Sequence, residues 1–178
     1  MKTINVELEG ISPLLMHNIE SADLRSGTRK RTKKYDLKEE AKKNAYWSKN
    51  KKELVVPARC IYGMILKSAS YFKVKGRALT PIIAGAISIE PEEIGLGTKK
   101  YDIDVRSVVI QRQRILRARP RLNKWKLKFK IIYDETYISS DILRDVIKDG
   151  GIKVGLLDFR PANKGSFGKF KIKKWVVK

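Results

Sequence analysis

Basic side chains at closely repeated positions are the first residues of this sequence whose spacing suggests a chemical role. Five arginines lie between Arg112 and Arg121, and lysines alternate with apolar residues directly afterwards, at 124–131. Guanidinium groups bind phosphate in a bidentate manner or stack on nucleobases, and ammonium groups act as point charges. Alternate side chains of a strand share one face, so the lysines predict a row of four ammonium groups, and the adjoining arginines extend it to a larger binding surface. Its members are Arg112, Arg114, Arg117, Arg119, Arg121, Lys124, Lys126, Lys128 and Lys130.

The charge of the whole chain supports the same interpretation. The 178 residues include 40 Lys or Arg and 19 Asp or Glu, a net charge of +21. Residues 25–52 hold twelve basic and three acidic side chains, and residues 106–130 hold ten basic and no acidic ones. Such a one-sided distribution indicates a phosphate-binding surface, since a merely solvated thermophile surface balances lysine with glutamate. We therefore expect a nucleic-acid partner, and no membrane partner because no basic segment also has a strong apolar helical face.

Candidate catalytic residues are few. His17 follows the first predicted strand and could serve as a general base, although a histidine without a partner is more often structural. Asp36, with Asp23 second, lies in a basic loop, but Asp36 and Glu39 also have the spacing of a helix N-cap and its N3 residue. One Cys and one His cannot supply a three-ligand zinc site, and neither a P-loop nor a nucleophile elbow is present. We expect a non-catalytic protein with no metal or cofactor.

The apolar pattern predicts the elements that position these groups. Strict alternation predicts a half-buried strand at 3–8 and another at 125–131. Ile61, Met64 and Ile65 recur at helical spacing after Pro57, which suits the first helical position. Further strands are predicted at 82–89, 105–110 and 170–177, and further helices from Asp36 and from Ser139 to Asp149, the last ended by Gly150-Gly151.

The order of these elements predicts an α+β fold. Without a basic loop at about 18–53 and a basic hairpin at about 95–122, the order is βαββαβ, the ferredoxin-like arrangement, in a single domain over 1–178. No apolar run reaches the roughly 20 residues of a membrane span. The first residues, MKTINVELEG, contain no signal-peptide h-region. We expect a cytoplasmic protein.

Three short motifs carry a family resemblance. The first predicted strand ends in Gly10-Ile11-Ser12-Pro13-Leu14-Leu15, a helix follows Leu54-Val55-Val56-Pro57-Ala58, and Gly165-Ser166-Phe167-Gly168-Lys169-Phe170 leads into the last strand. Together they resemble the RAMP superfamily of CRISPR effector subunits, specifically the backbone subunits along guide RNA, or a divergent or virus-borne relative. The resemblance implies a palm that holds single-stranded RNA, the guide strand, and leaves open whether the target strand is held as well. It also implies that 95–122 is a thumb reaching a neighbouring copy and that 18–53 is a finger-like insertion.

Sequence-independent coating of RNA by several copies, alongside other effector subunits, is therefore the expected function. Two alternatives stay open: a metal-independent RAMP-type endoribonuclease with His17 as base, or with Asp36 cutting target RNA, and a ribosomal or ribosome-assembly protein. Gly165 and Gly168 either bring backbone amides close to phosphates or turn the chain into the last strand. The residues expected to bind nucleic acid are Arg29, Lys30, Arg31, Lys33, Lys34, Arg59, Lys67, Arg112, Arg114, Arg117, Arg119, Arg121, Lys126, Lys128, Lys130, Arg160, Lys164, Gly165, Ser166, Gly168 and Lys169.

Overall fold

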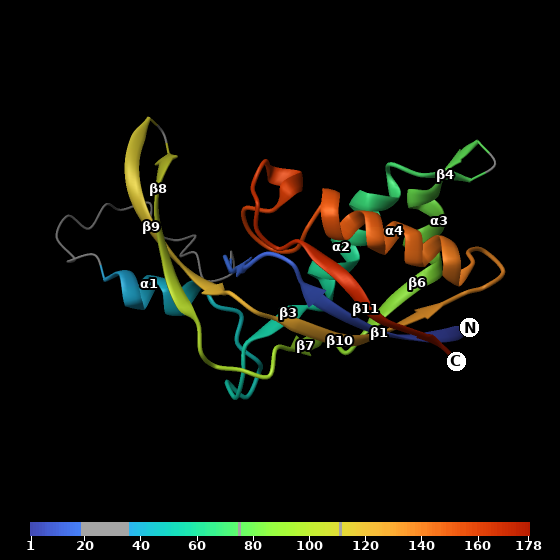
Figure 1. Cartoon of the computed structure of the whole chain (residues 1–178), viewed down its shortest axis with the longest axis horizontal. Coiled ribbons are helices and arrows are strands. Elements are labelled where there is room, and N and C mark those ends of the chain that lie inside the picture. The colour runs from blue at the N-terminus through green and yellow to red at the C-terminus, as the bar shows by residue number, and fades with distance from the viewer. Residues whose placement is uncertain (19–35, 75, 111) are drawn as a thin grey trace.

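The computed structural model describes residues 1–18, 36–74, 76–110 and 112–178. Its central sheet contains β1 (Lys2–Gly10), β6 (Ile87–Glu90), β10 (Lys126–Tyr133) and β11 (Phe170–Val177) in the order β11-β1-β10-β6. All neighbouring strands of this sheet are antiparallel. The expected α+β class is confirmed, with α2 (Ala58–Ala69) between β1 and β6 along the chain and α4 (Ser140–Lys153) between β10 and β11. Figure 1 shows both helices on the same side of the sheet.

Alternating apolar residues form the sheet side of the core. Ile4, Val6 and Leu8 of β1 are buried, and Val6 lies opposite Phe129 of β10. The residues between them face the other side, as the period-two pattern predicts. The core-facing stripe of α2, with Ile61, Met64 and Ile65, is likewise buried and packs against the sheet and α4. Pro57 is the N-cap of α2 and not its first helical residue.

The end of α4 differs from the prediction. Gly150 and Gly151 lie inside the helix, which continues to Lys153, and Gly155 with φ +70° follows its end. A Cβ on Gly150 would lie 2.5 Å from Met64 Sδ, and a Cβ on Gly151 would collide with the Phe170 carbonyl oxygen. The glycine pair therefore allows α4 to approach α2 and β11 closely. These glycines are required by tertiary packing and do not end the helix.

The predicted strand at 82–89 is wrong. Helix α3 (Leu79–Ala86) occupies most of it, and β6 begins only at Ile87. Leu79, Ile83 and Ala86 are buried and recur at helical spacing. A short apolar run fits a buried strand and a buried helix equally well, so its packing against α2 decided the outcome.

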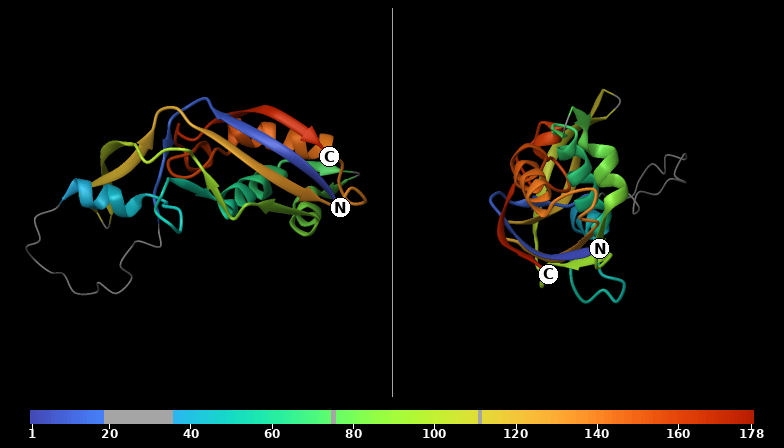
Figure 2. Two further views of the ribbon diagram at one scale, coloured as in Figure 1. Left: turned by 90° about the horizontal axis from the view of Figure 1, so that it is seen from below. Right: turned by 90° about the vertical axis from the view of Figure 1, so that its right-hand side faces the viewer.

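Most of the remaining elements form an extension beside the central sheet and its helices. β8 (Asp102–Ile110) and β9 (Gln113–Leu122) make a long hairpin, and β2 (Leu14–Leu15) joins it in a second sheet of order β2-β9-β8. Helix α1 (Leu37–Asn44) packs on β9, and hairpin and α1 together form one end of an elongated molecule whose termini lie at the other end (Figure 2). Small pairs complete the fold: β3 (Val55–Pro57) with β7 (Glu93–Gly95), β4 (Lys73–Val74) with β5 (Arg77–Ala78), and a 3-10 turn η2 (Pro161–Asn163).

Two aromatic residues anchor the segment after α1. The Tyr46 hydroxyl donates to the His17 carbonyl at 3.0 Å, and the Trp47 indole N–H donates to the Lys42 carbonyl at 3.2 Å. Both rings are partly buried against the core. They therefore fasten this segment to the body of the protein.

Candidate nucleic-acid interface

Two arginines of the hairpin are held by carboxylates from other parts of the chain. Arg117 Nη1 lies 2.9 Å from Glu40 Oε1 of α1, and Arg119 Nη1 lies 2.6 Å from Asp158 Oδ2 in the loop after α4. The Arg119 side chain is only 11% exposed. These two arginines dock the hairpin onto its neighbours, so their first role in this structure is to position β9.

Arg112 and Arg114 differ from the arginines nearer the base of the hairpin. Both are exposed, and Arg112 lies in the turn with φ +65°. Within the described parts of the chain, neither guanidinium group is paired with a carboxylate. Among the described residues, these two cations at the tip of the hairpin therefore have no acidic partner.

Stacked arginine and phenylalanine side chains join the base of the hairpin to the C-terminal loop. The Arg106 guanidinium lies 4.9 Å from the centre of the Phe167 ring and 5.5 Å from that of Phe159. Arg121 lies 5.7 Å from the Phe167 ring, and Asp104 approaches both arginines, at 2.7 Å from Arg106 and 3.9 Å from Arg121. Cation–π contacts of this kind hold the hairpin against the loop.

The glycines of the C-terminal loop serve close packing. Gly168 has φ +69°, and a Cβ on Gly165 would collide with the backbone of Phe159. Their amides are occupied, since Gly165 N donates to the Arg160 carbonyl at 2.9 Å and Gly168 N donates to the Pro13 carbonyl at 2.8 Å. The turn interpretation accounts for both residues, since both N–H groups already donate to backbone carbonyls.

Other residues of this loop remain accessible. Lys164 and Ser166 are exposed, and Lys164 has φ +59°. Lys169 N donates to Ser12 Oγ at 2.9 Å. The buried Nε of Arg160 and that of Arg121 have no hydrogen-bond partner among the described residues.

The lysine row of β10 lies on the open face of the sheet, where it alternates with acids. Lys126 Nζ lies 3.3 Å from Glu9 Oε1, and Glu9 also contacts Lys171 at 3.4 Å. The hydrogen bond from Lys126 is the main cause that lowers the pKa of Glu9. Lys128 lies opposite Glu7, and Lys130 lies opposite Glu90. The expected uninterrupted row of cations is thus a mixed surface with an excess of lysine.

His17 has a partner that its sequence neighbours did not reveal. Its Nδ1 lies 3.7 Å from Asp158 Oδ2, the oxygen that Arg119 also binds. Burial raises the pKa of Asp158, but contact with His17 and the charge of Arg119 lower it more, so the pKa lies below its ordinary value. The imidazole is 43% exposed.

The other predicted residues lie apart from the junction between the base of the hairpin and the loop after α4. Asp36 is the N-cap of α1 and accepts from Lys38 N at 2.8 Å, as its spacing with Glu39 predicts. Arg59 and Lys67 are exposed on α2, where Lys67 lies 5.8 Å from the centre of the Tyr71 ring. Cys60 is partly buried. Five predicted binding residues and Asp23 lie outside the described residues: Arg29, Lys30, Arg31, Lys33 and Lys34.

Two groups of the junction were missed by sequence reasoning. Asp158 is far from His17 along the chain, and no local pattern links them. Arg106 and Asp104, by contrast, could have been found, since residues two apart on a strand share a face. Within the described residues, no group of three His, Cys, Asp or Glu side chains could hold a metal ion, and no helix is long and apolar enough to cross a membrane.

Comparison with known proteins gives a structural likeness. No protein-family model matches the chain, and no curated protein matches its sequence. A chain in the cryo-EM structure of the type III-B Cmr-beta bound to cognate target RNA matches with a TM-score of 0.67 and 13% sequence identity. The match covers 99% of this chain and 60% of that chain, so this protein spans less than two thirds of its neighbour's length. The chain shares its fold with a protein of a CRISPR complex.

Proposed function

We propose that this protein is a non-catalytic backbone-type subunit of a CRISPR effector complex that binds single-stranded RNA independently of its sequence. The observation that carries the proposal is the fold likeness, over 99% of the chain, to a protein in a complex bound to target RNA. The net charge of +21 supports it independently, because a polyanion relieves the repulsion among so many like charges.

The topology supports a ferredoxin-like palm of the RAMP type. Strand order β11-β1-β10-β6, with α2 and α4 as the two crossover helices, is the order expected of a βαββαβ unit. The hairpin of β8 and β9 then corresponds to the thumb. Its Val109 and Leu116 are 66% and 52% exposed, which supports a contact with a neighbouring copy along the RNA.

The RNA contacts of this proposal come from cations that the protein itself does not neutralise. Arg112 and Arg114 at the hairpin tip and Lys164 in the C-terminal loop meet this condition among the described residues. Lys128 and Lys130 add charge on the open sheet face. All of these groups recognise phosphate and none is placed to read a base edge, which is what a strand-coating subunit requires.

The test compares two double variants that remove equal charge. Arg112→Ala/Arg114→Ala removes two proposed contacts, whereas Lys73→Ala/Lys148→Ala removes two exposed lysines elsewhere. A single-stranded phosphate contact contributes about 0.7 to the slope of log K against log salt. Two lost contacts lower the slope by about 1.4. If the tip variant and the wild type bind alike in roughly 1 M salt, the variant then binds about 25-fold more weakly than the wild type in roughly 0.1 M salt. Fluorescence anisotropy with an oligouridine measures this.

We expect the tip variant to show that loss and the lysine variant to bind like the wild type. Equal behaviour of the two variants would remove the hairpin tip from the interface. A wild type that leaves purification with no nucleic acid, stays a monomer and binds no oligouridine would overturn the proposed function. Copurified RNA in a complex of several subunits that dissociates in about 1 M salt would support it.

The His17–Asp158 pair favours one second candidate, a metal-independent endoribonuclease. A histidine oriented by a carboxylate through Nδ1 can use its other nitrogen as a general base. The same carboxylate is already bound by Arg119 at 2.6 Å, however, which explains Asp158 structurally. Cleavage of a labelled RNA in EDTA by the wild type, abolished in His17→Ala with RNA affinity unchanged, would replace the non-catalytic proposal.

A further inference from the structure

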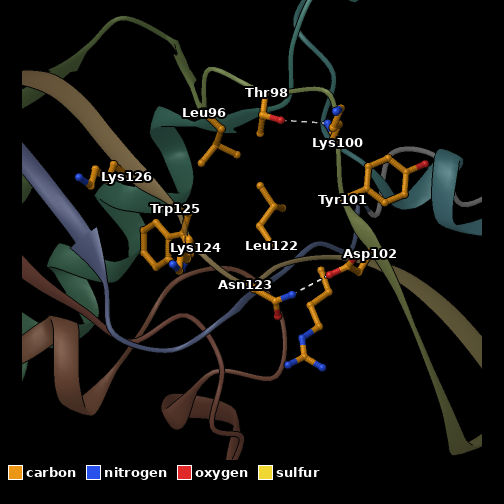
Figure 3. Close-up of a pocket in the computed structure, with 11 residues that line it drawn as sticks. Leu96, Thr98, Lys100, Tyr101, Asp102, Leu122, Asn123, Lys124, Trp125 and Lys126 are labelled. Carbon is orange, nitrogen blue, oxygen red and sulfur yellow. Dashed lines mark hydrogen bonds between the residues drawn. The ribbon is translucent and has the colours of Figure 1, made fainter.

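An open cleft of about 640 Å³ lies where the hairpin meets the central sheet (Figure 3). The segment from Leu96 to Asp102 forms one side, and the segment from Arg121 to Lys126 forms the other. Leu122 and Trp125 are only 4% and 5% exposed and form an apolar floor, with Leu96 beside them. The Trp125 indole N–H donates to the Ser12 carbonyl at 2.8 Å, which fixes the ring in place.

The rim of this cleft is positively charged. Lys100 and Lys124 are exposed on opposite sides, and across the described ranges neither has a carboxylate partner. Lys126 is already paired with Glu9. The acid of the cleft, Asp102, accepts a hydrogen bond of 2.6 Å from Asn123 Nδ2. Lys100 and Lys124 therefore outnumber Asp102, and the rim attracts an anion.

Polar groups between floor and rim keep free hydrogen-bonding capacity. Asn123 uses one amide hydrogen for Asp102, which leaves its second N–H and its carbonyl oxygen. Thr98 Oγ1 accepts from Lys100 N at 3.0 Å and can still donate its hydrogen. Figure 3 shows Thr98 and Asn123 on opposite sides of Leu122. A ligand with an apolar face and a polar edge would find complementary groups here.

We propose that this cleft binds one nucleotide of the unpaired strand, with its base on the floor of Leu122 and Leu96 and its phosphate between Lys100 and Lys124. The inference rests on the proposed function and adds a base-binding site to it. A nucleotide combines the three features that the cleft matches: an apolar ring face, a polar ring edge and a phosphate. A site for phosphates only would need no apolar floor, and a site for an apolar ligand would need no lysines.

Photocrosslinking tests the position of the base. An oligouridine that carries 5-iodouridine is irradiated with the full-length protein, and the adducts are mapped by mass spectrometry after trypsin digestion. Tyr101 borders the cleft and lies in the tryptic peptide 101–106. Tyr71 and Tyr137 serve as internal references, because they are 52% and 69% exposed and lie outside the cleft. Random encounters would mark these two more than Tyr101.

We expect adducts on residues 101–106 or on Trp125. Loss of the one phosphate contact lowers the slope of log K against log salt by about 0.7, so Lys100→Ala/Lys124→Ala, if it binds like the wild type in about 1 M salt, should bind oligouridine about 5-fold more weakly than the wild type in about 0.1 M salt. Lys73→Ala/Lys148→Ala is the control of equal charge. Adducts elsewhere only, or a cleft variant that binds like the control, would overturn the base-binding site while oligouridine binding by the wild type upholds the proposed function. Absence of wild-type binding would overturn both.

Discussion

Two glycines in helices offer a sharp test of how α4 packs. Gly151 lies in α4, where a Cβ would collide with the Phe170 carbonyl oxygen and lie 3.0 Å from the Phe170 ring. Gly63 lies in α2 with no heavy atom within 4 Å of the position of a Cβ. The same substitution to alanine therefore has opposite steric consequences at the two positions.

The expected magnitudes follow from this difference. Alanine is favoured over glycine inside a helix by about 1 kcal/mol, and this gain applies to both variants. At Gly63 nothing opposes it, so we expect Gly63→Ala to raise the free energy of unfolding by about 0.5–1 kcal/mol. At Gly151 the backbone of β11 must move, and overpacking of this kind costs about 1–3 kcal/mol, so the net change in Gly151→Ala is a loss of up to about 2 kcal/mol.

Thermal and urea unfolding followed by circular dichroism measure both variants. In a protein of this size 1 kcal/mol corresponds to roughly 2–4 °C in melting temperature, so the two variants should differ by several degrees and in opposite directions. If Gly151→Ala stabilised the protein as much as Gly63→Ala does, α4 would not lie against Phe170, and the explanation of the glycine pair would be refuted.

Two further predictions concern a partly buried carboxylate and a buried hydroxyl group. Asp158→Asn loses the Arg119 ion pair and destabilises the protein at neutral pH. The pKa of Asp158 is lowered from 3.8, so its contribution to the free energy of unfolding is lost as the pH falls below 3.8. Urea unfolding should therefore show the stabilities of the variant and the wild type converging in acid. Ser68→Ala removes a buried hydrogen bond of 2.7 Å from α2 to the Val146 carbonyl and should cost about 1 kcal/mol, more than Ser70→Ala at an exposed position.

Local patterns in the sequence were sufficient for much of the fold. The strict alternation at 3–8 predicts β1 because each apolar side chain has only one face to occupy, and Asp36 and Ser139 predict helix starts because their side chains accept from the first free amides. The 79–86 helix and the interior glycines of α4 were missed for a shared reason. In both cases the decisive information is the neighbour across the core, which no local pattern contains.

The candidate site was less predictable than the fold. Sequence spacing singled out the hairpin arginines as candidates, but it could not show that Glu40 and Asp158 bind two of them, at separations of 77 and 39 residues. The cleft at the base of the hairpin was also invisible, because Leu96 and Leu122 come from segments that only the fold brings together.

The stretch from Arg106 to Lys130 shows why local charge overstates what RNA can use. It contains ten basic residues and no acid, yet Arg106, Arg117, Arg119, Arg121 and Lys126 each lie within 4.0 Å of a carboxylate oxygen outside the stretch. These acids are mostly shielded from solvent, with Asp104 and Glu40 only 8% and 15% exposed. Removing an arginine from such a pair would leave a poorly solvated carboxylate, so the pairs persist when RNA binds. The remaining five cations can each contribute about 0.7 to the slope of log K against log salt. The contribution of this stretch to that slope is therefore at most about 3.5, half of what ten phosphate contacts would give.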